Sequence, residues 1–166
     1  MRIYILGFMG AGKSSYAQRL ATHLSYHFID LDSEIENSEK QSVSEVWQTK
    51  GEKYFRKIEQ TVLKKTALHP DTVVACGGGT PVFSDNMEFM NRQGITIYLK
   101  PGKQLVLNRL KNNRQQRPLI SDMNDMEIEK FMDRHLKKRN LYYRKAHFVI
   151  DPMQIDVSYI RDFLFK

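Results

Sequence analysis

The sequence predicts a three-layer α/β fold, a five-stranded parallel sheet with helices on both faces, in one domain over residues 1–166. Three observations lead to this prediction. Short β-rich runs alternate with segments of helical periodicity. The chain is long enough to bury one core. Three unusual polar or glycine-rich sequences each follow a predicted strand, and the carboxyl ends of parallel strands meet at the edge where such folds bind ligands.

The strands are expected where apolar, β-rich runs are bounded by turn or loop residues. The first covers residues 2–6, and a helix follows over residues 14–24, because its apolar residues recur on one face. The other predicted strands cover residues 28–30, 72–76, 95–99 and 148–150.

Capping signals place several of the helices. Ser42 and Glu45 have the spacing of a capping box, which predicts a helix start at Ser42, and Gly51 is expected to interrupt that helix. Ser84 is expected to cap a later helix that ends near Gly94. The remaining predicted helices cover residues 52–68, 103–110, 125–144 and 156–165.

Residues 7–14 read Gly-Phe-Met-Gly-Ala-Gly-Lys-Ser and match the phosphate-binding pattern G-x-x-x-x-G-K-[ST] at every fixed position. The match stands between a predicted strand and a predicted helix. The glycines let successive N–H groups point at one anion, and the helix N-terminus adds its positive dipole end. We expect Lys13 to reach the β- and γ-phosphates of a nucleoside triphosphate and Ser14 to ligate Mg²⁺. The expected nucleotide-binding residues are Gly10, Ala11, Gly12, Lys13, Ser14 and Ser15.

Asp30 and Asp32 follow the second predicted strand. In phosphoryl transfer, one carboxylate of such a pair holds Mg²⁺, directly or through water, and the other accepts a hydrogen bond from the acceptor hydroxyl. Each Asp alone is equally compatible with an N-cap of the next helix. Beside a phosphate loop, the pair favours the functional interpretation.

Gly77, Gly78 and Gly79 follow the third predicted strand. Three consecutive glycines indicate a close backbone approach, positive φ angles, or only a flexible turn. Arg56 and Glu59 share one helix face. They form either a surface ion pair or a site in which the guanidinium holds a substrate carboxylate with two hydrogen bonds, and the residues alone leave both interpretations open.

Residues 111–124 are polar, rich in Asn, Gln and Arg, and contain few candidates for a core. We expect a mobile loop that acts as a lid. Arg117 lies within it and would either stabilise charge on the transferring phosphoryl group or be exposed to solvent, and both interpretations stay open. Arg139, by itself, is expected on the solvated face of its helix.

The net charge of +7 is compatible with a nucleic-acid surface, but the basic residues are spread along the chain. Anionic substrates also require local positive charge, so we favour a phosphate-handling enzyme without a nucleic-acid partner. Cys76 is the single cysteine, which is compatible with a reducing cytoplasm. No cationic leader opens the chain and no apolar run has membrane-spanning length, so we expect a cytoplasmic protein without a membrane partner.

Taken together, these residues resemble the shikimate kinase family over nearly the whole chain. The matching signals are residues 7–14, Asp30-Leu31-Asp32, Gly51-Glu52-x-x-Phe55-Arg56-x-x-Glu59, Gly77-Gly78-Gly79, Arg117-Pro118-Leu119, and Arg139 followed by Leu141-Tyr142-Tyr143. The resemblance implies a P-loop kinase fold with a mobile lid. It also implies ATP-dependent, Mg²⁺-requiring phosphorylation of the 3-hydroxyl of shikimate to shikimate 3-phosphate, a step toward chorismate and the aromatic amino acids. We expect a monomer.

The resemblance also implies roles for individual residues. On the nucleotide side, Lys13 would contact the terminal phosphates, Ser14 would ligate Mg²⁺, Asp30 would support the metal, and Arg117 would come down with the lid. Many relatives also carry an arginine that stacks on adenine. Arg109 and Arg114 are candidates for that role, with an ambiguous register in which Leu110 falls at the position instead.

On the acceptor side, a helical region over residues 32–60 would bind shikimate. Asp32 would hold the hydroxyls and act as base or only position the 3-hydroxyl. Arg56 and Arg139 would bind the carboxylate. The other implied contacts are Gly78 and Gly79 at the ring hydroxyls, Trp47 and Phe55 as pocket walls, and Glu59 orienting Arg56.

Two alternative enzyme or switch classes are weaker. A nucleoside monophosphate kinase would need base-recognition groups and a second phosphate clamp, whereas Arg56 and Arg139 suit a single carboxylate, and a gluconate kinase is a further possible P-loop kinase. A GTP-binding switch would carry N-K-x-D, which the sequence lacks.

Overall fold

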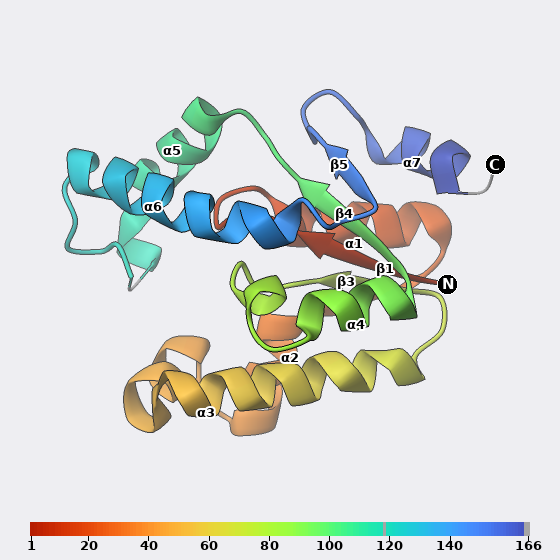
Figure 1. Ribbon diagram of the computed structural model, residues 1–166, viewed down its shortest axis with the longest axis horizontal. Helices are drawn as coiled ribbons and strands as arrows, with labels where there is room; N and C mark the ends of the chain where they lie inside the picture. The colour runs from red at the N-terminus through yellow and green to blue at the C-terminus, as the bar shows by residue number, and fades with distance from the viewer. Residues whose placement is uncertain (118, 165–166) are drawn as a thin grey trace.

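The computed structural model describes residues 1–117 and 119–164, so Pro118 of the lid motif and Phe165, the predicted end of the last helix, lie outside the described residues. The sheet has five parallel strands in the order β2-β3-β1-β4-β5, and Figure 1 labels β1, β3, β4 and β5. They are β1 (Arg2–Leu6), β2 (His27–Asp30), β3 (Thr72–Ala75), β4 (Ile95–Leu99) and β5 (Phe148–Ile150). The predicted parallel sheet is confirmed.

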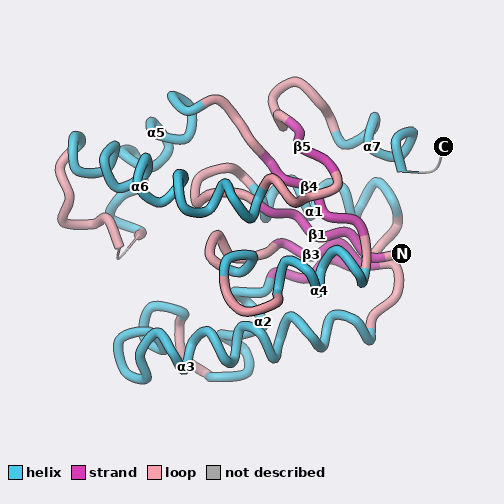
Figure 2. Tube along the Cα trace, in the orientation of Figure 1, coloured by secondary structure: helices cyan, strands magenta, loops and turns pink. Residues whose placement is uncertain are grey.

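Helices connect all of these strands (Figure 2). They are α1 (Lys13–Leu24), α2 (Leu31–Glu39), α3 (Val43–Lys65), α4 (Asn86–Gln93), α5 (Lys103–Asn112), α6 (Asp125–Tyr143) and α7 (Val157–Leu164), with the short 3₁₀ turns η1 (Thr66–Leu68), η2 (Thr80–Val82) and η3 (Arg114–Gln116). Within the described ranges, none of these helices has the length and hydropathy needed to cross a membrane.

Two clusters of buried side chains, one on each face of the sheet, hold the three layers together. Alternate residues of β1 point to opposite faces, because side chains alternate along a strand. Ile3 and Ile5 pack with α1 and α7, whereas Tyr4 and Leu6 pack with α2, α3 and α4. A third cluster joins Phe8 of the phosphate loop to apolar residues of α5 and α6, outside the sheet.

The kink of α3 confirms the prediction made from Ser42 and Gly51. Ser42 accepts a hydrogen bond from the backbone of Glu45, and the Glu45 carboxylate accepts one from the backbone of Ser42. Gly51 interrupts the helix with φ of 79° and ψ of 167°, a conformation that residues with a Cβ rarely adopt. The break divides α3 into two parts, and Arg56 lies in the first turns of the second.

One local prediction was wrong. The helix after η2 begins beyond Asp85, and Ser84 does not cap it; its hydroxyl donates to the Asp85 carboxylate, at 3.3 Å. The lid segment contributes few residues to the core, as expected, but one of them, Ile120, is fully buried in the third cluster. In a polar segment, one apolar residue gives no periodicity, so its burial depends on the groove that α5 and α6 provide.

Candidate functional site

The phosphate loop joins β1 to α1, in the predicted order of strand, loop and helix. Gly10 and Gly12 have φ of 80° and 86°, the left-handed region that glycine adopts without strain. The Lys13 ammonium group donates to the carbonyl of Phe8 at 3.1 Å, which holds it across the loop. Burial lowers the pKa of Lys13 to about 8, against the opposing effect of the Asp32 carboxylate. The cation therefore lies in a weakly hydrated place beside an acid.

The two carboxylate oxygens of Asp30 accept different hydrogen bonds. Its Oδ1 accepts from the backbone N–H of Asp32 and Ser33, at 3.1 and 3.4 Å, and so caps α2. Its Oδ2 accepts from the hydroxyl of Ser14 at 2.6 Å. The N-cap interpretation and the placement beside the phosphate loop are thus both correct. The bounds of α2 were not predicted, because only Leu31 and Ile35 give it an apolar face.

The oxygens of Ser14 and Asp30 form a pair that suits Mg²⁺. Within residues 1–117 and 119–164, no three His, Cys, Asp or Glu side chains gather as a metal site. Mg²⁺ in kinases does not require such a cage, because one or two protein oxygens suffice when phosphates and waters complete its octahedron. The donor set of Ser14 and Asp30 therefore fits Mg²⁺ held together with a nucleotide.

Asp32 lies at the carboxyl end of the sheet, next to the triple glycine. Its Oδ1 is 3.2 Å from the place where a Cβ on Gly77 would stand. Although the residue as a whole is exposed, protein atoms desolvate its carboxyl group and raise its pKa to about 6, and the negative charge of Asp30 acts in the same direction. Lys13 opposes this shift. Asp32 is therefore more basic than an ordinary carboxylate, as an acceptor for a hydroxyl proton should be.

The three glycines after β3 each make room for a different charged side chain. A Cβ on Gly78 would stand 3.0 Å from Nη1 of Arg139, and a Cβ on Gly79 would stand 2.6 Å from Nη2 of Arg56. None of the three has a positive φ. Of the interpretations offered for this motif, close approach is correct and left-handed backbone is wrong.

Arg56 forms the predicted pair with Glu59, but the pair is not on the surface. The Arg56 Nη1 lies 2.7 Å from Oε2 of Glu59, and the two side chains are only 15% and 1% exposed. A second, exposed carboxylate, that of Glu52, stands 3.7 Å from the Arg56 Nε. The guanidinium also lies over the rings of Phe83, Trp47 and Phe55, with distances to their centroids of 3.9, 5.1 and 5.2 Å.

Arg139 reaches the same edge from α6. Its guanidinium lies 5.3 Å from the centroid of the Phe8 ring, so it bridges the phosphate loop and the glycines. Tyr143, one turn further along α6, donates a hydrogen bond to the carbonyl of Gly78. Arg139 is thus half-buried at the site rather than on the solvated helix face that it alone suggested.

Three further arginines lie on the nucleotide side. Arg117 is half-buried, burial lowers its pKa, and its Nε makes no hydrogen bond within the part of the chain that the structure describes. Arg109 donates to the carbonyl of Gly10 at 3.1 Å. Arg114 instead pairs with Asp125 at 3.2 Å, which keeps it away from the loop. Leu110 is fully buried in the third cluster, so it is Arg109 that adjoins the phosphate loop.

The sequence did not single out Thr80 and Phe83, which contact Glu59 and Arg56 directly. The hydroxyl of Thr80 donates to Oε1 of Glu59 at 2.6 Å, and Phe83 stacks on Arg56. Their position just after the three glycines was the only available signal. Nothing in their side chains indicates which part of α3 they meet.

The fold and the site define a class. A phosphate loop follows β1, a carboxylate pair follows β2, and two arginines face the glycines that follow β3. A nucleotide site thus adjoins a second site whose cations suit a small anionic acceptor. This arrangement is that of a P-loop kinase acting on a small molecule.

Comparisons with known proteins narrow the class. The family model described as shikimate kinase matches residues 9–160. A shikimate kinase from Bacteroides fragilis is 39% identical over 164 residues, which cover 95% of this chain and 92% of that protein. One from Azobacteroides pseudotrichonymphae is 42% identical over 149 residues, which cover 89% and 88%.

Solved structures agree. A shikimate kinase from Bacteroides thetaiotaomicron superposes with a TM-score of 0.93 at 34% identity, covering 99% of this chain and 98% of that one. A shikimate kinase from Acinetobacter baumannii, in complex with shikimate, has a TM-score of 0.85 at 32% identity, covering 98% and 89%. The chain belongs to the shikimate kinase family.

Proposed function

We propose that Asp32, Arg56 and Arg139 hold the acceptor in the reaction of this family, the ATP-dependent phosphorylation of the 3-hydroxyl of shikimate to shikimate 3-phosphate, toward chorismate and the aromatic amino acids. The observation that carries the proposal is the triple glycine. Gly77 stands against Glu59, Thr80 and Asp32. Gly78 stands against Arg139 and the carbonyl of Gly7 in the phosphate loop, and Gly79 stands against Arg56. One small molecule on these glycines therefore reaches Asp32, Arg139, Arg56 and the nucleotide site.

The two arginines suit the carboxylate of shikimate. Guanidinium groups bind carboxylates with parallel hydrogen bonds, which fixes orientation as well as charge. Gly78 and Gly79 offer backbone at the ring hydroxyls, and Trp47 and Phe55, whose rings are 5.1 Å apart, wall the pocket. Held by its carboxylate, shikimate would present a hydroxyl to Asp32, whose raised pKa suits it to accept or hold that proton.

On the donor side, Lys13 and Arg117 neutralise charge on the γ-phosphoryl group as it leaves ADP, which is the main form of catalysis in phosphoryl transfer. The backbone of residues 10–15 cradles the phosphates, and Arg109 flanks the loop on the side proposed for adenine. Ser14 and Asp30 would hold Mg²⁺, the latter through water. When bound, that ion shields the negative charge of the β- and γ-phosphates.

The remaining proposals concern the division of the chain into functional regions, its location and its partners. We propose one kinase domain, with residues 111–124 as a lid that carries Arg117 over the phosphates and residues 32–60 as the shikimate-binding region. Exclusion of water by such a lid prevents hydrolysis of ATP in place of transfer. We further propose a cytoplasmic monomer without a nucleic-acid or membrane partner, which agrees with its use of ATP.

An acceptor screen tests the function. Purified protein is incubated with ATP and Mg²⁺, and ADP release is measured with shikimate, gluconate or a nucleoside monophosphate as acceptor. We expect release that depends on shikimate and on Mg²⁺ and that yields shikimate 3-phosphate. Turnover with another acceptor but not with shikimate would refute the proposal.

A further inference from the structure

Only part of the Arg56 guanidinium is hydrogen-bonded within the described part of the chain. Nη1 lies 2.7 Å from the Glu59 carboxylate. The buried Nε makes no hydrogen bond among the residues that the structure describes, and Glu52 is 3.7 Å away from it. Nη2 is not among the buried unpaired atoms, so a substrate carboxylate can approach the guanidinium there. How well it binds depends on how firmly the guanidinium is held in place.

Glu59 holds Arg56, and Thr80 holds Glu59. The Glu59 side chain is 1% exposed and accepts from Arg56 through Oε2 and from the Thr80 hydroxyl through Oε1, at 2.7 and 2.6 Å. Thr80 is fully buried in the turn η2, and its carbonyl accepts from the side-chain amide of Asn86 at 2.9 Å. The turn after the glycines is thus linked to the guanidinium by a continuous buried chain of hydrogen bonds.

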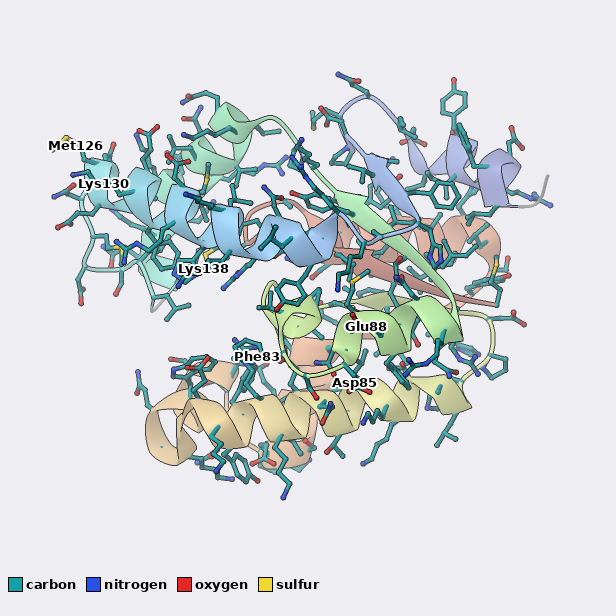
Figure 3. The ribbon with its side chains drawn as sticks, viewed as in Figure 1. Phe83, Asp85, Glu88, Met126, Lys130 and Lys138 are labelled. Carbon is teal, nitrogen blue, oxygen red and sulfur yellow. The ribbon has the colours of Figure 1, made fainter. Side chains whose placement is uncertain are left out.

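Phe83 holds the same group by its face. Its ring centroid is 3.9 Å from Cζ of Arg56, closer than those of the two rings that α3 itself supplies. Figure 3 shows Phe83 projecting from the turn before α4 toward α3. A guanidinium over an aromatic face is attracted by the ring quadrupole. Glu59 thus restrains Arg56 within the guanidinium plane, and Phe83 restrains it perpendicular to that plane.

We infer that Thr80 and Phe83 are positioning residues for the acceptor: from the turn that follows the glycines, they hold the guanidinium of Arg56 in place for the substrate carboxylate. The inference deepens the proposed function and rests on the role given there to Arg56. An arginine side chain loses considerable rotamer freedom when it is ordered. Restraint before binding removes that loss from the binding step, so it improves shikimate affinity without touching the phosphoryl transfer.

Thr80→Val tests the hydrogen-bonded arm. It keeps the shape of the side chain and removes the donor to Glu59. We expect the KM for shikimate to rise about threefold to tenfold, with kcat and the KM for ATP within about twofold. Thr80→Ser, which keeps the hydroxyl, should have the same KM for shikimate as the parent. Thr66→Val is the matched control, because Thr66 is also buried and donates, to the carbonyl of Leu63 at 2.7 Å, in η1.

Phe83→Leu tests the stacked arm, because it keeps an apolar side chain and removes the aromatic face. The expected rise in shikimate KM is about threefold, and Phe83→Tyr should leave the KM unchanged. Phe89→Leu is the control, because Phe89 packs against the core cluster that α3 and α4 share, whereas the rings over Arg56 in the described part of the chain are those of Trp47, Phe55 and Phe83. Both controls are expected to lower Tm and to leave the shikimate KM unchanged.

The same two substitutions in an Arg56→Ala background separate positioning from general loss of structure. If Thr80 and Phe83 act through Arg56, neither substitution changes the shikimate KM further once Arg56 is absent. Further rises in that background would overturn the inference, as would Tm losses without a KM change in the parent. Should Arg56→Ala alone leave the shikimate KM unchanged, the proposed role of Arg56 fails, and the inference fails with it. A rise for Arg56→Ala with no effect of Thr80→Val or Phe83→Leu refutes only the inference.

Discussion

Gly79 is a glycine because Arg56 occupies the place of its side chain. A Cβ on Gly79 would stand 2.6 and 2.8 Å from the two Nη atoms of Arg56. Real Cβ contacts are not that short, so the guanidinium and a side chain at position 79 exclude one another. The pair joins the end of β3 to the middle of α3, and it gives a physical reason for the last glycine of the motif.

Gly79→Ala should therefore impair the acceptor site. The colliding atoms are the far end of the Arg56 side chain, and moving it away disturbs its buried pair with Glu59, so we expect the shikimate KM to rise and Tm to fall while the KM for ATP stays constant. Gly102→Ala is the matched control, since a Cβ there meets nothing within 4 Å. Equal effects of the two substitutions would contradict this reading of Gly79.

Arg56→Ala should weaken shikimate binding far more than ATP binding. The loss of a charge-assisted pair of hydrogen bonds to a carboxylate costs on the order of 1.5–3 kcal/mol. Because Glu59 then loses its cationic partner, Arg56→Ala is compared with the double variant Arg56→Ala/Glu59→Gln. Isothermal titration with each ligand measures the two affinities, and equal losses for shikimate and ATP would indicate a structural role only.

Asp32 should titrate near pH 6 in the metal-free protein. Burial raises its pKa from 3.8 to about 6, Asp30, Glu59 and Glu36 add negative charge, and Lys13 opposes them. Since the folded-state pKa exceeds the unfolded value, the stability contributed by this carboxyl is fully present below 3.8 and is lost as pH rises through about 6. Carboxyl NMR in the presence of a chelator measures the titration directly.

The variant Asp32→Asn provides the corresponding stability test. Its side chain does not ionise, so its stability relative to the parent should increase as pH rises through about 6, while kinase activity is lost. Chemical unfolding on either side of that pH gives the difference. An unchanged difference across this range would mean that Asp32 has an ordinary pKa.

Asp30→Asn should separate the metal role of Asp30 from its capping role. Asn is as good an N-cap as Asp, so α2 should keep its cap and Tm should change little. The lost carboxylate charge should raise the Mg²⁺ concentration for half-maximal activity on the order of tenfold. Asp30→Ala, which loses both roles, should in addition lower Tm. A normal Mg²⁺ requirement in Asp30→Asn would refute the metal role.

Ile120→Ala should destabilise the protein by about 2–5 kcal/mol, the cost of truncating a buried aliphatic side chain. Ile120 is fully buried, and its backbone N–H donates to the carbonyl of Arg117 at 2.9 Å. Truncation removes the side chain that anchors this turn to the core, so it should also reduce kcat by loosening Arg117. Leu119→Ala, at an adjacent residue that is 52% exposed, is the control. Urea unfolding of both variants measures the difference.

Features set by neighbouring residues were predictable. The five strands, the kink at Gly51 and the Ser42 capping box follow from apolar runs, a required positive φ and side-chain spacing, all of which act over a few residues. The failures were equally local. The helix α2 has too narrow an apolar face to show periodicity, and Ser84 resembled a cap although the helix starts one residue later.

The surroundings of the Arg56–Glu59 pair could not be predicted from the sequence. The spacing of Arg56 from Glu59 indicated an ion pair without saying whether that pair lies in water or in protein, because the same i, i+3 contact serves both. The pair is buried because Phe83 and Gly79 lie against Arg56, and both of these residues come from the chain beyond β3.

By itself, the sequence determined that this chain folds as a parallel α/β sheet with a phosphate loop at one edge, and its resemblance to a family suggested the charged residues that we propose for the second site. Only the tertiary structure decided how those residues are held. Thr80 supports Glu59, Phe83 covers Arg56, and Ile120 secures the segment of Arg117. The physical reason is that strands, caps and turns are encoded by near neighbours, whereas the orientation of a buried charge depends on atoms that folding brings from other elements.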